Sequence, residues 1–219
     1  MTMKGIFFKS FFSIILLGIT TWYVWDLVNK GVDVKWYTSG GLLAAIFFSL
    51  LTSFKRTWAP ITTPLYALAK GLFLGGISAY AEIRFPGMPM KAVSITILTF
   101  FVMLLLYQLR IIVVTKRFRS VIISAAITIM FIYIINWILT FFRLSLPFVW
   151  GTSWFAIGFN IVAAIIASFS LLLDFDFIDR KVGRAPKNYE WVATWGLLVT
   201  LVWLYIEVLR LIKKLAIRF

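Results

Sequence analysis

Seven runs of about twenty apolar residues, separated by short polar segments, dominate this 219-residue sequence. The hydrocarbon core of a bilayer is about 30 Å thick, and an α-helix needs about 20 apolar residues to cross it. A single soluble domain would have to hide all seven runs in one core. With 62% hydrophobic and 14% charged residues, the composition is also far from that of soluble domains. The runs therefore predict an all-α integral membrane protein.

The predicted spans follow the apolar runs and end at glycine, proline or basic residues. They cover residues 6–27, 37–54, 61–81, 89–109, 120–142, 152–175 and 190–212. No internal repeat, linker or second domain is evident. We therefore predict one polytopic transmembrane domain over residues 1–219.

The distribution of basic residues predicts the orientation, because Lys and Arg are enriched in cytoplasmic loops. With the N-terminus inside, the inner segments hold twelve basic residues and the outer loops hold five. The five are Lys30, Lys35, Arg84, Lys91 and Arg143. This bias predicts an N-terminus inside, although a basic C-terminal segment then lies outside, against the rule.

The absence of cysteine and histidine excludes several kinds of site. Thiolate nucleophiles, His-based zinc sites, Ser-His dyads and histidine proton relays all need one of the two, so we expect no cofactor and no metal site. The net charge of +14 would suit nucleic acid, but the cations form short clusters between the spans. Such clusters are typical of topology signals and of contacts with anionic lipid, so the predicted partner is the bilayer rather than nucleic acid. Intramembrane aspartates would suit an aspartyl protease, but its Gly-x-Gly-Asp motif is missing and we predict no enzyme.

The stretch LLLDFDFID, residues 171–179, contains three of the eight acidic residues in the chain. At 100° per residue, Asp174 and Asp176 point to nearly opposite sides of a helix, whereas Asp176 and Asp179 share a face. Two basic residues follow directly, so Asp176 and Asp179 are interpreted as an interfacial helix end paired with those cations. Asp174 has no such partner close in sequence and needs one from another helix.

Lys70 and Glu207 are further ionisable residues inside predicted spans, where such groups cost about 2.5–3.5 kcal/mol and usually mark function. Lys70 lies about ten residues from either end of the third span, so an interior carboxylate partner is expected. Glu207 lies in the seventh span, and Arg210 three residues later could pair with it, placing both at the outer interface. Small residues that follow Lys70 predict close helix packing; they are Gly71, Gly75, Gly76 and Ser78.

Asp174 and Glu207 form a candidate proton sensor if their carboxyl groups meet and share a proton. A simple hairpin that turns near residue 184 would offset them by about 13 residues, or roughly 20 Å. The pair then requires the seventh span to begin outside the bilayer, or a broken helix near Gly196. Otherwise the closer partner of Asp174 lies near Trp195.

Three segments in this order, APITTPLYALAKGLFLGGISAYAE, LLLDFDFI and EWVATWGLLVTLVWLYIEVLRLI, resemble the Bax inhibitor-1-like (transmembrane Bax inhibitor motif) family. The likeness runs from about residue 58 to residue 212 and is greatest to a bacterial branch. It implies a seven-helix bundle with the last helix central, in the inner (cytoplasmic) membrane of a bacterium. The bacterial relatives are pH-sensitive calcium leak channels, in which acids of the sixth and seventh helices share a regulatory proton; these acids correspond to Asp174 and Glu207.

The sequence departs from the family pattern at three positions. Glu207 replaces the usual aspartate, Arg210 stands where relatives are usually uncharged, and Lys70 stands where many relatives are expected to be acidic. Lys70, Arg210 and Asp176 are therefore candidate supporting charges for the Asp174–Glu207 pair. The expected function is a proton-regulated leak of cations, with Ca²⁺ suited to carboxylate oxygens. The alternative is a non-conducting membrane scaffold that modulates a membrane protease or a stress-response partner.

Overall fold

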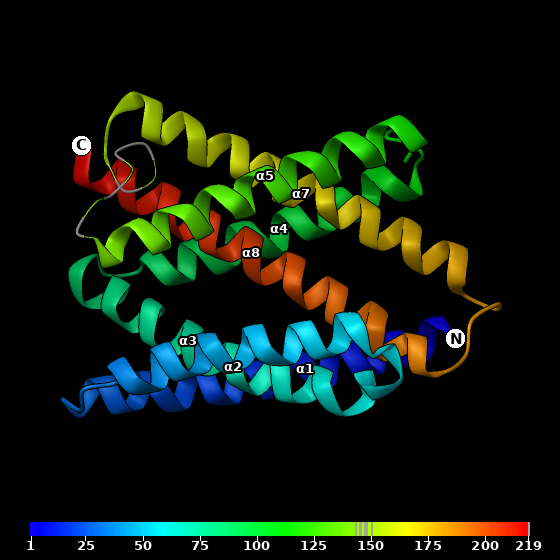
Figure 1. Ribbon diagram of the computed structural model, residues 1–219, viewed down its shortest axis with the longest axis horizontal. Coiled ribbons are helices and arrows are strands. Elements are labelled where there is room, and N and C mark those ends of the chain that lie inside the picture. Colours follow the sequence, from blue (N-terminus) through cyan, green and yellow to red (C-terminus); the bar gives the residue numbers. More distant parts are fainter. Residues whose placement is uncertain (143, 145, 147–148, 150, 219) are drawn as a thin grey trace. The chain divides into compact units, whose positions relative to one another are not determined.

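The chain is described by a computed structural model, which covers residues 1–142, 144, 146, 149 and 151–218 (Figure 1). Arg143, one of the cations used to predict the orientation, lies outside the described residues. Within them the structure has seven α-helices, a short 3₁₀-helix and no strand. In chain order these are α1 (Met3–Asn29), α2 (Lys35–Phe54), η1 (Arg56–Trp58), α3 (Ala59–Arg84), α4 (Met88–Gln108), α5 (Lys116–Phe141), α7 (Trp154–Lys181) and α8 (Asn188–Arg218).

Six of these helices, α1, α2, α4, α5, α7 and α8, are long and apolar enough to cross a membrane. The predicted all-helical membrane fold is therefore confirmed. The third predicted span corresponds to α3, which has 26 residues but is less apolar because it contains Lys70 and several small or hydroxylated residues. The most apolar part of α8 is 67% buried, against at most 17% in α1, α2, α4 and α5, as expected for a central last helix.

The helices form two compact units. The first unit comprises Met1–Pro89 and Phe177–Val199, and the second comprises Met90–Asp176 and Thr200–Phe219. The divisions fall inside α7 and α8, so each of these helices contributes residues to both units. Each unit is described below by itself.

In the first unit, α3 packs against both α1 and α2. The helices approach closely because glycines, which have no side chain, lie where they cross. A Cβ atom at Gly71 of α3 would lie 1.9 Å from Thr20 Oγ1 of α1, and one at Gly41 of α2 would lie 2.7 Å from the carbonyl oxygen of Ala69. The glycines after Lys70 thus allow the close approach that the sequence predicted.

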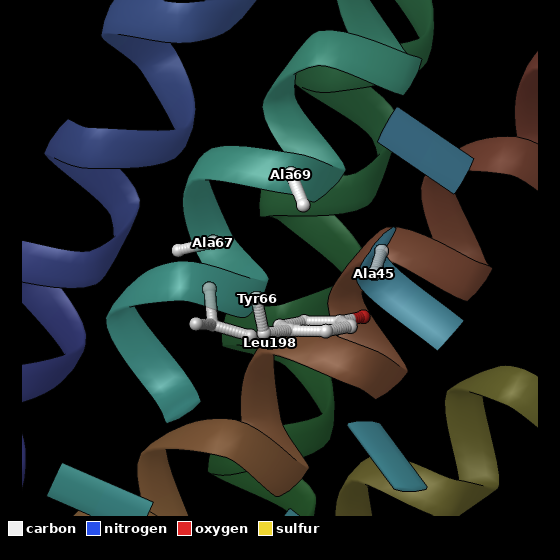
Figure 2. Packing of buried hydrophobic residues seen from close by; sticks show 5 residues of the cluster. All are labelled: Ala45, Tyr66, Ala67, Ala69 and Leu198. Carbon is white, nitrogen blue, oxygen red and sulfur yellow. The ribbon is translucent and has the colours of Figure 1, made fainter. Parts of the chain in front are cut away.

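The apolar core of the first unit lies where α2, α3 and α8 meet (Figure 2). Tyr66 of α3 lies in this cluster with a 3% exposed surface, and Leu198 of α8 with 2%. The other members are alanines, which let the helix backbones approach. They are Ala45, Ala67 and Ala69.

Hydrogen bonds bring the first residues of α1, α3 and α8 to one end of the first unit. Thr63 Oγ1, near the start of α3, donates to the carbonyl oxygen of Trp191, near the start of α8, at 3.2 Å. The backbone N–H of Gly183, in the loop before α8, donates to the carbonyl oxygen of Met1 at 3.0 Å. The N-terminal segment and the α7–α8 loop therefore lie on the same side of this unit.

In the second unit, aromatic contacts hold α4 and α5 against α7. Phe118 near the start of α5 lies 5.7 Å from Phe169 of α7, centroid to centroid, and Phe100 of α4 lies 5.5 Å from Phe175. Both pairs are edge-to-face, the geometry that aromatic rings prefer. The later parts of α4 and α7 and the start of α5 thus lie together.

Adding one methyl group at Gly41 should destabilise the protein, whereas adding it at the neighbouring Gly40 should not. A Cβ at Gly41 would lie within 3 Å of α3 backbone atoms, but nothing lies within 4 Å of a Cβ at Gly40. Overpacking of this kind costs about 1–3 kcal/mol. In thermal unfolding of the detergent-solubilised protein, Gly41→Ala should lower the midpoint and Gly40→Ala should leave it unchanged or raised. Equal midpoints would contradict the close α2–α3 packing.

Candidate functional site

Glu207 lies at the centre of a hydrogen-bonded cluster in the second unit. It is fully buried. The Tyr133 hydroxyl donates to its two carboxylate oxygens at 2.8 and 2.9 Å, Asn160 Nδ2 donates to Oε2 at 2.9 Å, and Trp203 Nε1 donates to Oε1 at 3.0 Å. Arg210 Nη1 lies 3.6 Å from Oε1. Three helices, α5, α7 and α8, thus supply the partners of one carboxylate.

The Arg210 side chain links the same carboxylate to an aromatic ring. Its guanidinium carbon lies 4.5 Å from the centroid of the Tyr133 ring, within the range of a cation–π contact. The sequence left open an ion pair of Glu207 and Arg210 at the outer interface. The pair is present, but Glu207 has no exposed surface, so the carboxylate lies in the protein interior.

Asp174 has a different environment from Glu207. Its carboxylate accepts a hydrogen bond from the Thr200 hydroxyl of α8. Its Oδ2 atom is buried and, among the described residues, has no hydrogen-bond partner. Because buried polar atoms are nearly always paired in proteins, an unpaired carboxylate oxygen requires an explanation.

The structure does not bring Asp174 and Glu207 together. The partner of Asp174, Thr200, precedes Glu207 by seven residues on α8, or roughly 10 Å along a helix. α8 runs without a break from Asn188 to Arg218, so the broken helix near Gly196 is not present. The two carboxylates therefore have separate partners, and their role as proton sensors stays a prediction.

Asp176 is buried and forms an ion pair with Arg119 at the start of α5. The sequence interpretation assigned to it the two cations that follow the stretch along α7, so the interhelical partner was missed. Arg119 is one of several basic residues around the α4–α5 connection that were interpreted only as topology signals. The pair connects two helices of the second unit.

Lys70 lies half-buried on α3 of the first unit, with its ammonium nitrogen 5.1 Å from the centroid of the Phe73 ring. Its position far from either end of the predicted span led us to expect a carboxylate partner for it. The part of the chain that the structure describes gives it none. The aromatic ring, three residues further along the same helix, is the contact found instead.

Glu190, which the sequence analysis did not select, forms a second buried carboxylate cluster, in the first unit. It is 4% exposed and accepts hydrogen bonds from the backbone N–H of Thr2 at 2.8 Å and from the Thr2 hydroxyl at 3.1 Å. Lys9 Nζ lies 2.5 Å from its Oε2 atom. The cluster fastens the start of α1 to the start of α8. Its members are about 180 positions apart, so local spacing gave no signal for it.

Lys214, near the end of α8, is also buried, although it lies in the basic segment expected to be outside the membrane. Its ammonium group donates to the carbonyl oxygens of Val149 and Ala156 at 2.8 and 3.1 Å. Carbonyl groups just before or at the start of α7 thus take the place of a carboxylate. Among the described residues, no group of three or more acidic residues is arranged to hold a metal ion.

The fold and these buried polar clusters define the class: a multi-pass, all-helical membrane protein with ionisable side chains inside its helix packing. The family model described as Bax inhibitor 1 like matches residues 1–217. The chain therefore belongs to the Bax inhibitor 1 like family, and the match includes the first two spans, which lie outside the resemblance seen in the sequence. No curated protein and no solved structure matches the chain.

Replacing Tyr133 with phenylalanine should destabilise the second unit, because it removes the hydroxyl that donates to both oxygens of buried Glu207. A hydrogen bond of this kind is worth about 1–2 kcal/mol. Tyr80→Phe is the matched control, since the Tyr80 side chain is 44% exposed. Thermal unfolding should show a lower midpoint for Tyr133→Phe alone. Equal midpoints for the two variants would contradict the cluster.

Replacing Glu190 with alanine should destabilise the protein by about 2 kcal/mol or more, because Lys9 and Thr2 then lose a buried acceptor. The control is Asp26→Ala, which removes a more exposed ion pair with Lys30, worth about 0–1 kcal/mol. Guanidinium should not be used for this comparison, because its salt screens the ion pairs. Urea or thermal unfolding that ranks Asp26→Ala as the more damaging change would refute the assignment.

Proposed function

We propose that this protein is a cation leak channel of the bacterial inner membrane, that protons regulate the leak, and that Ca²⁺ is among the ions conducted. Membership of a membrane-embedded family supports the location in a bilayer. The buried ionisable groups support the activity, because charged side chains inside spans are costly and mark ion or proton pathways.

The observation that carries the proposal is the buried Oδ2 atom of Asp174, for which the described residues provide no hydrogen-bond partner. Asp174 lies seven residues before the end of α7, about 10 Å from it along the helix. An unpaired carboxylate oxygen at this depth is able to accept a proton or to contact a cation. The two events exclude each other, which provides control by protons.

Oxygen ligands around Asp174 favour a hard cation. Its carboxylate and the Thr200 hydroxyl lie within hydrogen-bond distance, so two oxygen-bearing side chains face each other from α7 and α8. Ca²⁺ binds carboxylate oxygens and uncharged oxygens, such as those of carbonyl groups and water, rather than nitrogen or sulfur. Two side chains are too few for a high-affinity site, which suits a leak because ions must leave as readily as they enter.

Glu207 is proposed as a second, separate proton site. Its carboxylate accepts from Tyr133, Asn160 and Trp203, and Arg210 lies close to it. Protonation would remove the negative charge that holds Arg210 and would loosen the contacts among α5, α7 and α8. The charge pair of Arg119 and Asp176 supports the other end of α7, whereas Lys70 has no assigned role in this proposal.

An N-terminus in the cytoplasm is the orientation we propose. The starts of α1, α3 and α8 share one end of the first unit. Three of the four basic segments predicted to be inside lie at or next to these three starts in the sequence. Their common location supports a single cytoplasmic end for this unit.

The proposal is tested by reconstituting the protein in liposomes with an enclosed Ca²⁺ dye and measuring influx across a range of pH. Wild-type flux should change with pH, and Asp174→Asn should flatten this dependence because residue 174 no longer binds a regulatory proton. Asp179→Asn is the matched control, an exposed aspartate on the same helix. Glu207→Gln should alter the pH profile in addition to lowering thermal stability.

Flux that is insensitive to both Asp174→Asn and Glu207→Gln would disprove the proton sites but keep the leak. No flux at any pH from correctly folded protein would disprove the channel. Co-purification with a membrane protease would then favour the non-conducting scaffold.

A further inference from the structure

A basic recess lies at the end of α7 in the first unit. Its volume is about 310 Å³, at the lower end of the range for small-molecule pockets. The lining residues come from the last turn of α7, the following loop and the first turn of α8. They are Arg180, Lys181, Arg184, Ala185, Pro186 and Tyr189.

We propose that this recess binds the phosphate group of an anionic phospholipid headgroup. Three of the six lining residues are cations and none is acidic. Arginine guanidinium groups bind phosphate oxygens through two parallel hydrogen bonds, and lysine adds a mobile positive charge. Asp179 precedes Arg180 in the sequence but does not line the recess, and Glu190 already accepts hydrogen bonds from Thr2 and Lys9.

The loop that carries these cations is held in place before any ligand binds. Gly183 adopts φ of 75°, the left-handed conformation that favours glycine, and so turns the chain at the end of α7. The loop is bonded to the N-terminal segment on both sides: Gly183 N–H donates to the Met1 carbonyl oxygen at 3.0 Å, and Met1 N donates to the Ala185 carbonyl oxygen at 2.6 Å. A preformed loop loses less conformational entropy on binding.

An aromatic ring forms one wall of the recess. Lys181 Nζ lies 5.9 Å from the centroid of the Tyr189 ring, at the outer limit of a cation–π contact. The contact keeps the ammonium group beside the recess. A carboxylate in the same place would neutralise its charge, but the aromatic ring does not. Lys181 therefore remains able to interact with an anion.

The length of α7 favours a recess at the depth of lipid phosphates. α7 has 28 residues, so it is about 42 Å long, whereas the hydrocarbon core is about 30 Å thick. The helix is thus longer than the core, and basic residues favour the headgroup layer. Arg180 and Lys181 in its last turn therefore favour a position of this turn beside lipid phosphates.

A defined phosphate site and a general attraction between basic loops and anionic membranes predict different effects of mutations. General attraction depends on net charge, so removal of any loop cation should weaken lipid binding equally. A defined site should distinguish Arg184 and Lys181, which line the recess, from Lys187, which lies in the same loop but does not. Arg184→Gln, Lys181→Gln and Lys187→Gln each remove one positive charge, so they form a matched set.

The experiment is native mass spectrometry of the full-length protein, purified in a neutral detergent and titrated with phosphatidylglycerol. Arg184→Gln and Lys181→Gln should weaken the first binding event about tenfold or more, the effect of one lost charge-assisted hydrogen bond. Lys187→Gln should change it less than about twofold. Thermal unfolding of each variant establishes that it is folded, and Arg184→Lys, which keeps the charge, should restore part of the affinity.

Two further titrations identify the source of the phosphate. Phosphatidylcholine should bind more weakly than phosphatidylglycerol, and inorganic phosphate should not displace the lipid at equal concentration. Displacement by inorganic phosphate would overturn the lipid assignment in favour of a soluble phosphate compound. Equal weakening by all three glutamine variants would overturn the site altogether. Neither result bears on ion flux, so the outcome is independent of the proposed channel activity.

Discussion

The hydrocarbon core of a bilayer offers no hydrogen bonds, so each polar group within it must be satisfied by the protein itself. Hydrogen bonds within each helix satisfy the backbone groups, and the hydrogen bonds of buried side chains then determine which helices pack together. Glu207 draws donors from α5, α7 and α8, and Glu190 fastens the start of α1 to the start of α8. Within the first unit, the glycine and alanine contacts of α3 provide the close packing. A small number of buried carboxylates thus specifies which helices are neighbours.

The fold class could be predicted because apolar runs long enough to cross a bilayer leave few alternatives. The ends of the helices were harder to predict, since hydropathy indicates which residues cross the hydrocarbon core and not where the helix ends. The sixth predicted span stops at residue 175, whereas α7 continues to Lys181. The extension is stabilised by the ion pair of Asp176 with Arg119, a residue on another helix. Local sequence does not contain that information.

The carboxylates Asp174 and Glu207 could be selected from the sequence as candidates, but their contacts could not be predicted. Asp174 and Glu207 stood out because carboxylates are scarce within the spans. Their partners did not, because Thr200, Tyr133 and Trp203 are ordinary residues in a helical span and become significant only when a carboxylate faces them. The register of α7 against α8 determines which residue of α8 faces Asp174. The sequence left a partner near Trp195 as the alternative to Glu207, and the α8 residue that contacts Asp174 is Thr200, five residues after Trp195.

The order in which the chain is synthesised adds a consequence to the Glu207 and Glu190 clusters. Proteins emerge from the ribosome with the N-terminal part first. The helix that carries both carboxylates, α8, is therefore made after Thr2, Lys9, Tyr133 and Asn160. Donors for each carboxylate already exist when α8 enters the membrane, so its buried acids can be paired as the helix inserts.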